Sequence, residues 1–202
     1  MLLMSRSDAP YHHGNLGPVL EAAGIALLAQ KPHSSISLRE LAREADVSHN
    51  APYHHFGDKA GLFKRLGEVS MQRLVDQFLA ADSPGLDPGE RAVALGVAYV
   101  EFAIDNPHAF TLIYDPEVCV PGAPSETMAP LINQLEVTLG DAAAGLDPEA
   151  DPGRIEARAT ALWATVQGLS YLVIAGHLTR AQIRPALAES LRRYSDQAIA
   201  PM

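Results

Sequence analysis

Apolar residues recur at helical spacing along the chain, and the breaks between these runs separate the predicted elements. The apolar face of the first predicted helix, residues 15–30, consists of Leu16, Val19, Leu20, Ala23 and Leu27. Further helices are predicted over residues 37–45, 48–56, 58–80, 89–105, 108–114, 127–144, 151–175 and 179–198. No run alternates apolar and polar residues between hairpin turns, as a half-buried strand would. The pattern therefore predicts an all-α protein.

The segment from residue 37 to residue 56 combines two short predicted helices with a tight turn. Ser37 is followed three residues later by Glu40, which is a capping box at the start of a helix. Asp46 occupies the turn, where Asp tolerates the left-handed backbone conformation that a sharp reversal needs. Ser48 is expected to cap the second helix. Two helices joined in this way form a helix-turn-helix.

The second helix of this pair begins with short polar side chains. Ser48, His49 and Asn50 precede Pro52, and the first residues of a helix that enters the major groove contact base edges. Asn suits adenine, and the Tyr53 hydroxyl can donate to a phosphate while its ring packs. Pro52 costs little near a helix start, where the first N–H groups lack partners. These residues indicate that the helix binds DNA.

The helix that follows has the length to join two domains. At about 1.5 Å per residue, residues 58–80 would span roughly 33 Å. The clearest linker is the run SPGLDP at residues 83–88. We place a three-helix helix-turn-helix domain at residues 1–66 and a helical-bundle domain at residues 67–202. Within the second domain, residues 115–125 hold three prolines and are not expected to form a regular helix.

Charge divides unevenly between the two predicted domains. The formal net charge of the chain is −9. Residues 1–66 hold seven Lys or Arg against six Asp or Glu, whereas residues 67–202 hold eight against eighteen. A first domain of net charge +1 next to a second one of −10 fits DNA binding by the first, and a solvated acidic face explains the same asymmetry. With so few cations, DNA affinity is expected to depend strongly on salt.

The sequence lacks the motifs of common enzymes and metal sites. The adjacent pairs His12-His13 and His54-His55 diverge by about 100° on a helix, so neither is an i, i+4 pair of ligands. No H-E-x-x-H, G-x-x-x-x-G-K, G-x-G-x-x-G or G-x-S-x-G motif occurs. We expect no catalytic residues, no cofactor and no metal. A metal-dependent sensor or enzyme that uses the His clusters remains the alternative.

Cysteine usage and hydropathy bear on the compartment. Cys119 is the single cysteine, which excludes a disulfide within the chain and fits a reducing compartment. No run reaches the about 20 uninterrupted apolar residues of a membrane span. We therefore expect a cytoplasmic protein without a membrane partner.

Three runs of sequence carry a family resemblance. They are YHHGNL at residues 11–16, SLRELAREADVS at residues 37–48 and APYHHFGDKAGLF at residues 51–63. Together they resemble the DNA-binding domain of the TetR family of bacterial transcriptional regulators, in which Y-H-H-F-x-x-K follows the helix-turn-helix. Asp46 stands where that family usually has Gly, and Ala60-Gly61 stand where an acidic residue is usual.

The resemblance implies a ligand-responsive regulator, by family default a repressor. It would bind a palindromic double-stranded operator as a homodimer and be released by a small molecule bound in the second domain. Lys59 is expected to hold a phosphate near the start of the fourth helix, helped by the helix dipole. The N-terminal arm with Tyr11 and Arg6 would add contacts or be disordered. The predicted DNA contacts are Ser37, Arg39, Ser48, His49, Asn50, Tyr53, His54 and Lys59.

Aromatic, flexible and amide side chains gather on the middle helices of the second domain. An apolar cavity with a few polar groups is the usual ligand site, whereas aromatics at helical spacing also form plain core. The sequence around Trp163 looks like a subgroup with W-x-x-x-H-G-L, in which Gln167 here replaces His. The predicted ligand-binding residues are Tyr99, Phe102, Phe110, Ile113, Tyr114, Met128, Leu131, Trp163, Gln167 and Tyr171.

The helix around Trp163 is apolar on nearly every side. Such a helix is buried all round, or is half buried and half covered by another chain. In TetR-like proteins the last two long helices pair with their symmetry mates as a four-helix bundle. The resemblance puts near that interface Ala164, Gly168, Leu172, Ala175, Leu187, Leu191 and Tyr194, with Tyr171 beside them, and ordinary core within one chain is the alternative for each.

Overall fold

The computed structural model describes residues 16–83 and 85–197, with the backbone alone for residues 193–197. Its helices are α1 (Leu16–Leu28), the 3₁₀ turn η1 (His33–Ser35), α2 (Leu38–Glu44), α3 (Ala51–Phe56), α4 (Lys59–Ala80), α5 (Pro88–Asp105), α6 (Pro107–Ile113), α7 (Met128–Gly145), α8 (Pro152–Ile174) and α9 (Arg180–Gln197). These residues contain no strand, so the all-α prediction is confirmed. None of the described helices combines the length and apolar character needed to cross a bilayer.

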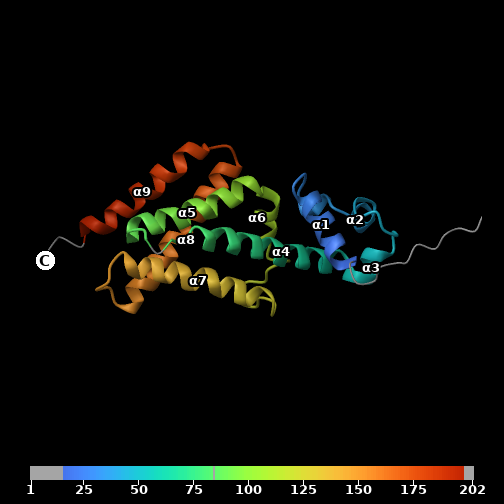
Figure 1. Ribbon diagram of the computed structural model, residues 1–202, viewed down its shortest axis with the longest axis horizontal. Coiled ribbons are helices and arrows are strands. Elements are labelled where there is room, and N and C mark those ends of the chain that lie inside the picture. Colours follow the sequence, from blue (N-terminus) through green and yellow to red (C-terminus); the bar gives the residue numbers. More distant parts are fainter. Residues whose placement is uncertain (1–15, 84, 198–202) are drawn as a thin grey trace, which may run out of the picture.

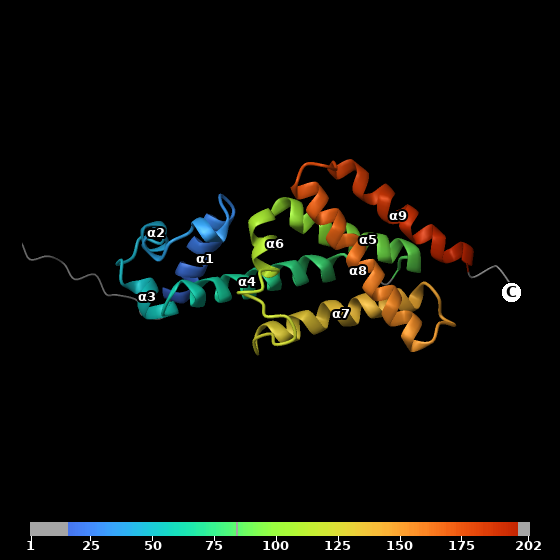
Figure 2. The ribbon, with the colours of Figure 1, turned by 180° about the vertical axis from the view of Figure 1, so that it is seen from behind.

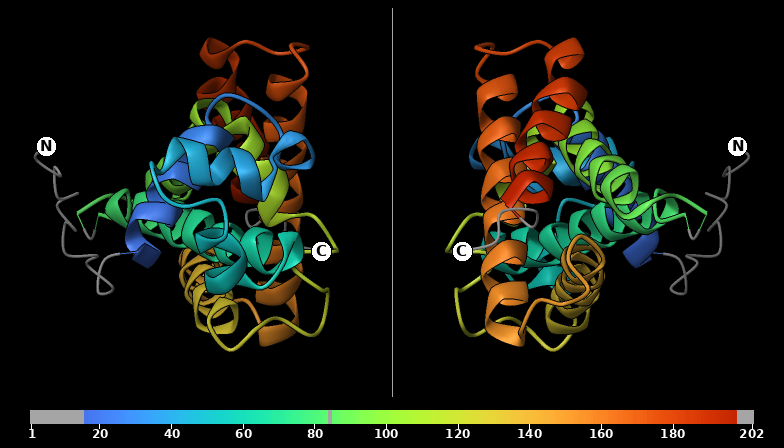
Figure 3. Two further views of the ribbon diagram at one scale, coloured as in Figure 1. Left: turned by 90° about the vertical axis from the view of Figure 1, so that its right-hand side faces the viewer. Right: turned by 90° about the vertical axis from the view of Figure 1, so that its left-hand side faces the viewer.

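The molecule is elongated, with two groups of helices joined by α4. Figure 1 shows α1, α2 and α3 at one end and α5 to α9 at the other, with α4 running from the first group into the second. The view from behind shows α7 along one side of α4, with α5 and α6 along the other (Figure 2). The end-on views of Figure 3 show α8 and α9 beside each other on one flank.

Aspartates set the starts of the three long helices that frame the second group. Asp58 precedes α4 and accepts the N–H three residues later at 2.8 Å. Asp87 and Asp151 precede α5 and α8, and each accepts two N–H groups at 3.0 and 3.1 Å. Each of these last two is followed by a proline at the first helical position, where its missing N–H costs nothing. Short capping signals thus decide where the scaffold helices begin.

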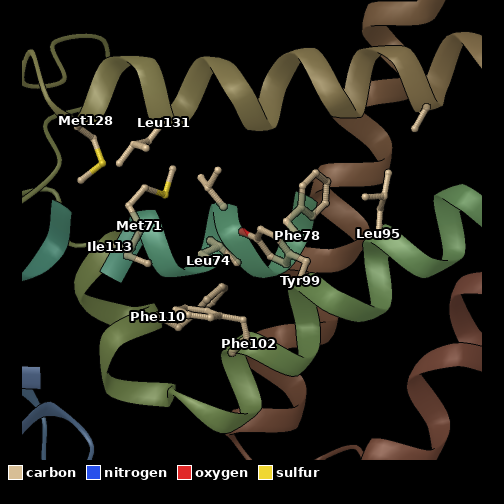
Figure 4. Close-up of a cluster of buried hydrophobic side chains, with 13 residues drawn as sticks. Met71, Leu74, Phe78, Leu95, Tyr99, Phe102, Phe110, Ile113, Met128 and Leu131 are labelled. Atoms are coloured by element: carbon tan, nitrogen blue, oxygen red, sulfur yellow. The ribbon is translucent and has the colours of Figure 1, made fainter. Parts of the chain in front are cut away.

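Buried apolar side chains of α4 belong to two cores. Leu62 and Leu66 are fully buried in the core that α1 and α2 also build, and Leu112 of α6 reaches into that same core. Further along α4, Met71 and Phe78 belong to the core of the second group. Figure 4 shows these two side chains rising from α4 toward α7. A third core lies between α5, α8 and α9. A movement of α4 therefore disturbs packing at both ends of the molecule.

Candidate DNA-binding surface and ligand cavity

The turn between α2 and α3 has the geometry that its sequence predicts. Asp46 has a φ of 51°, the left-handed conformation expected for it. The Val47 N–H donates to the Ala42 carbonyl at 3.0 Å, which is the six-residue closure of a Schellman motif. At the other end of α2, the Ser37 hydroxyl accepts the Glu40 N–H at 3.2 Å. Asp46 thus takes the place that Gly usually holds after a helix.

The start of α3 differs from the prediction. The helix begins at Ala51, the cap position is Asn50, and no side chain makes a capping hydrogen bond there. Pro52 has no N–H to offer the carbonyl of Ser48 four residues earlier. The Ala51 N–H donates to that carbonyl instead, at 2.9 Å. Residues 48–50 are consequently a turn that precedes the helix, and the prediction that Ser48 caps it is wrong.

Polar residues of α3 face solvent, and its small apolar residues face the domain core. Ala51 and Pro52 are buried. The exposed side chains of this segment include Ser48, His49, Asn50, Tyr53, His54 and His55, with Arg39 exposed on α2 and Ser37 exposed at its start. The labels of Figure 1 place α3 at the end of the molecule away from α5 to α9. This end therefore presents an open polar surface formed by the turn and α3.

Lys59 is exposed at the start of α4 but already has partners. Its Nζ donates to the Ser34 carbonyl at 2.9 Å and lies 5.1 Å from the centre of the Phe63 ring. The Asp58 carboxylate occupies the N-terminus of the same helix. An ammonium has three donors, so Lys59 keeps N–H groups for a phosphate. The nearby carboxylate opposes the help from the helix dipole that the sequence suggested.

A cavity of about 820 Å³ lies among α4, α5, α7 and α8. Of the predicted ligand-binding residues, its wall includes Tyr99, Ile113, Tyr114 and Trp163. Most of the remaining wall is aliphatic, with Leu95 on α5 and Leu135 and Leu139 on α7. The sequence did not single these leucines out, because nothing distinguishes a leucine that faces a void from one that faces another side chain.

Three polar groups meet on one side of this cavity. The Tyr99 hydroxyl donates to Gln167 Oε1 at 2.6 Å and is hydrogen bonded to the Tyr114 hydroxyl. Burial is the main cause that raises the pKa of both Tyr99 and Tyr114, while a hydrogen bond from Trp163 acts in the opposite direction. Both phenols are therefore uncharged at physiological pH. The cavity combines an apolar wall with a small neutral cluster of hydrogen-bonding groups.

The other predicted ligand residues do not line the cavity. Phe102, Phe110, Met128 and Leu131 are buried among other core side chains. Tyr171 is 44% exposed and its ring meets the edge of Phe110, with ring centres 5.9 Å apart. Helical periodicity indicates which side chains are buried, but it does not indicate which buried side chains border a space. These five residues, and Gln167, which is hydrogen bonded to Tyr99, are not part of the cavity wall, so ligand contact by them stays a prediction.

The outward face of α8 is apolar and exposed. Leu172 and Tyr171 on this face are each 44% exposed. The predicted interface residues on this face are Ala164, Gly168, Leu172 and Ala175, all exposed. A Cβ at Gly168 would meet nothing within 4 Å, so close packing within the chain does not require glycine there.

Two predicted interface residues on α9 lie elsewhere. Leu187 and Leu191 are 4% and 8% exposed and belong to the core between α5, α8 and α9. A Cβ on Gly96 of α5 would lie 3.1 Å from a Leu187 methyl group, which shows how closely these helices pack. The burial of these two leucines matches the alternative of ordinary core within one chain, and a contribution to the dimer interface stays a prediction. The side chain of Tyr194 lies outside the described residues, as do Tyr11 and Arg6.

The segment after α6 borders both the cavity and the DNA-binding end. Tyr114 and Cys119 line the cavity. Between them, Asp115 Oδ2 lies 3.1 Å from His33 Nε2 of η1. Val118 packs against the core of the first group, and one of its methyl groups lies 2.6 Å from where a Cβ of Gly67 would be. The two ends of this segment thus border the cavity, and residues between them contact the first group of helices.

A chain of polar contacts continues from this loop to α1. The Ser125 hydroxyl donates to Glu68 Oε1 at 2.8 Å, and Glu68 is buried on α4. Arg65 lies 3.4 Å from the other Glu68 oxygen and donates to Glu21 of α1 at 2.7 Å. The loop before α7, the helix α4 and the helix α1 are therefore linked by hydrogen bonds and ion pairs.

The alternative of a metal site finds no support in the described residues. Among them, no three His, Cys, Asp or Glu side chains lie close enough together to hold a metal ion. His54 and His55 are exposed at the end of α3. His12 and His13 lie outside the described residues.

The chain joins a helix-turn-helix with an open polar face to a helical bundle with a large cavity. This combination defines a transcriptional regulator that carries its DNA-binding domain and its ligand-binding domain in one chain. Residues 20–66 match the family model of bacterial regulatory proteins of the tetR family. Residues 92–197 match the model of the tetracyclin repressor-like C-terminal domain. The chain belongs to the TetR family of transcriptional regulators. Members are DNA-binding transcription factors rather than enzymes, and the chain is a ligand-responsive transcriptional regulator.

Solved structures have the same fold. A protein of unknown function from Rhodococcus sp. RHA1 is 31% identical with a TM-score of 0.74, and the match covers 92% of this chain and 98% of that one. A tetR-family transcriptional regulator from Streptomyces coelicolor shares the fold at 17% identity, a TM-score of 0.71 and coverages of 91% and 82%. A transcriptional regulator from Rhodococcus sp. Rha1 shares the fold at 24% identity with a TM-score of 0.65. That match covers 91% of this chain and 98% of the other. The W-x-x-x-H-G-L subgroup stays a prediction.

Proposed function

We propose that the chain is a repressor that binds a palindromic operator as a homodimer and leaves it when a small molecule fills the cavity. One α3 covers few base pairs, whereas two of them related by a two-fold axis read both halves of an inverted repeat. Such half-sites lie about 34–36 Å apart or a multiple of this, so a small change in the separation of the two helices disfavours binding.

The observation that carries this proposal is the double contact of the segment between Tyr114 and Cys119. A ligand in the cavity touches Tyr114 and Cys119, and the residues between them touch η1 and α4. Occupancy then shifts the first group of helices relative to the second. The effect is a coupling free energy, so DNA must weaken ligand binding by the same factor.

The homodimer is supported by the exposed face of α8. Contiguous apolar surface on a soluble chain usually marks a site where another chain binds. We assign the interface to Ala164, Gly168, Leu172 and Ala175 with the adjacent Tyr171, because they share this face. Leu172→Glu should give a monomer with much reduced DNA affinity. Val137→Glu is the matched control, since Val137 is 54% exposed on α7.

The DNA contacts divide by chemistry into two groups. His49 and Asn50 stand exposed in the turn before α3, where their side chains reach base edges. Ser37, Arg39, Ser48, Tyr53, His54 and Lys59 surround them with groups that suit phosphates.

The test is selection of binding sites from a pool of random-sequence duplex DNA. The selected sites should carry an inverted repeat, and Tyr53→Ala should bind them weakly while keeping its helical circular dichroism. Selected sites without a repeat would refute the palindrome. Undiminished binding by Tyr53→Ala would show that α3 does not contact the DNA.

A further inference from the structure

The charged side chains on the cavity wall are all acidic. Among the described residues that line the cavity, the charged ones are Glu136 of α7 and Glu156 of α8, and both are exposed. The wall has no Lys, Arg or His among those residues. An anion in the cavity would share its wall with two carboxylates and lose hydration without gaining a cationic partner, which is strongly unfavourable.

The polar groups inside the cavity are neutral and already partly paired. Tyr114 and Tyr99 are joined to each other, and Tyr99 donates to Gln167. With Tyr99 donating to the amide, the Tyr114 hydroxyl must donate to Tyr99, and the Tyr114 oxygen keeps acceptor capacity. A ligand hydroxyl can donate to that oxygen. Nothing in this cluster neutralises a full charge.

The wall is long in one direction. Its residues on α8 extend from Pro152 to Val166, which at about 1.5 Å per residue is about 21 Å of helix. The polar cluster lies near Trp163, toward the C-terminal end of this stretch, and aliphatic side chains of α7 and α9 line the wall as well. This arrangement fits a chain-like molecule with one polar end.

We infer that the cavity binds an uncharged, elongated apolar molecule with a terminal hydroxyl, and that it discriminates against the carboxylate of the same chain length. This inference rests on the proposed function, in which the cavity is the effector site. The hydroxyl lies against Tyr114 and Trp163, and the hydrocarbon chain lies along α7 and α8. Exclusion of anions follows from the two glutamates and from the absence of a basic group on the described wall.

The chain contains its own reporter for this test. Trp163 is the one tryptophan of the sequence and lines the cavity. Its fluorescence is titrated with dodecanol, dodecanoate and dodecyltrimethylammonium, each below its micellar concentration, on the full chain without DNA. We expect dodecanol to bind at least tenfold more tightly than either charged probe. Equal or tighter binding of dodecanoate overturns the inference, as does tighter binding of the ammonium compound or failure of dodecanol to bind.

Two variants separate binding in the cavity from binding at the surface. Ala159→Phe puts a ring into the cavity wall and should abolish the dodecanol response with the helical content unchanged. Glu156→Lys reverses an exposed charge at the wall and should strengthen dodecanoate binding severalfold with dodecanol unaffected. A dodecanol response that survives Ala159→Phe contradicts binding in the cavity. No gain for dodecanoate in Glu156→Lys contradicts exclusion by charge.

The outcome for the proposed function is measured separately on a selected duplex. If dodecanol binds but does not weaken the complex with DNA, the ligand class stands and release by the ligand fails. If the chain binds its inverted repeat but no dodecanol, the ligand class fails and the DNA-binding function stands.

Discussion

His33 Nε2 lies 3.1 Å from Asp115 Oδ2, and this contact joins the DNA-binding end of the chain to the segment that borders the cavity. The His33 ring also meets the edge of Phe63 of α4, with ring centres 5.0 Å apart. Both side chains of the pair are mostly buried. A shift of Asp115 therefore acts on η1 directly and on α4 through the imidazole ring.

Replacing Asp115 tests whether this contact transmits ligand binding. Asp115→Asn keeps an oxygen that can accept the Glu117 N–H, as Asp115 Oδ1 does at 2.8 Å, but it removes the charge facing His33. We expect DNA affinity to change little and the loss of affinity caused by dodecanol to shrink severalfold, within the range of about 5–150-fold that couplings usually span. Fluorescence anisotropy of a labelled duplex, with and without dodecanol, measures both.

Glu117→Gln is the matched control, because Glu117 is exposed in the same segment. It should leave the coupling as it is. A coupling that stays at the unmodified value in Asp115→Asn would show that the signal takes another route.

The buried Glu68 should contribute more to the free energy of unfolding than its hydrogen bond to Ser125 alone would. Glu68→Ala removes a partner of both Ser125 and Arg65, and we expect a loss of about 1–3 kcal/mol in the free energy of unfolding. Ser125→Ala should cost about 1 kcal/mol. Denaturant unfolding of both single variants and the double variant gives the coupling. Strict additivity of the two changes would mean that the contact contributes nothing.

Asn50 and Lys59 should affect DNA binding in different ways. Asn50→Ala should lower the preference for the operator over random DNA by about 1–3 kcal/mol. Lys59→Ala should weaken binding to both alike and reduce the salt slope by about one unit. Anisotropy titrations at several salt concentrations measure both quantities. An equal loss on operator and random DNA for Asn50→Ala would rule out base reading by this residue.

The ion pair between Asp82 and Arg91 predicts a dependence of stability on pH. Arg91 donates to both Asp82 oxygens, at 2.6 and 2.9 Å, and this hydrogen bonding lowers the pKa of Asp82. The folded chain therefore binds this proton less tightly than the unfolded chain. The pair stabilises the fold above the ordinary carboxyl pKa, and this stabilisation is lost as the pH falls through the lowered pKa.

Asp82→Asn should accordingly be less stable by about 1 kcal/mol at pH 7, since the pair is only partly exposed. The difference from the unmodified chain should disappear in acid. Denaturant midpoints measured from pH 7 down to about pH 2 test this. A difference that stays constant over that range would assign the loss to packing rather than to charge.

Local signals in the sequence predict the helices and the turn well. Ser37, Asp58, Asp87 and Asp151 cap helices, and each capping bond involves residues within four positions, so the chain shows them without any tertiary information. Asp46 was likewise recognisable as the left-handed residue of the turn. Ser48 does not set the start of α3, because the missing N–H of Pro52 outweighs the capping preference of serine.

The cavity and the outer faces depend on tertiary packing, which a periodic pattern does not contain. Phe110 and Tyr99 look alike in the sequence, yet Phe110 is enclosed by other rings and Tyr99 borders the space. In the same way, Leu187 and Leu172 both sit on apolar stripes of long helices. Leu187 packs against Gly96 of α5, and Leu172 faces outward. Which of these side chains is enclosed depends on how each helix is rotated about its own axis in the packed fold.

The mass of the complex formed on one inverted-repeat duplex tests the central claim most directly. Native mass spectrometry of the full chain with a selected duplex should find two chains on each duplex and no complex with one. This result follows if a two-fold dimer places one α3 on each half-site. A stable complex of a single chain with the duplex would contradict the account.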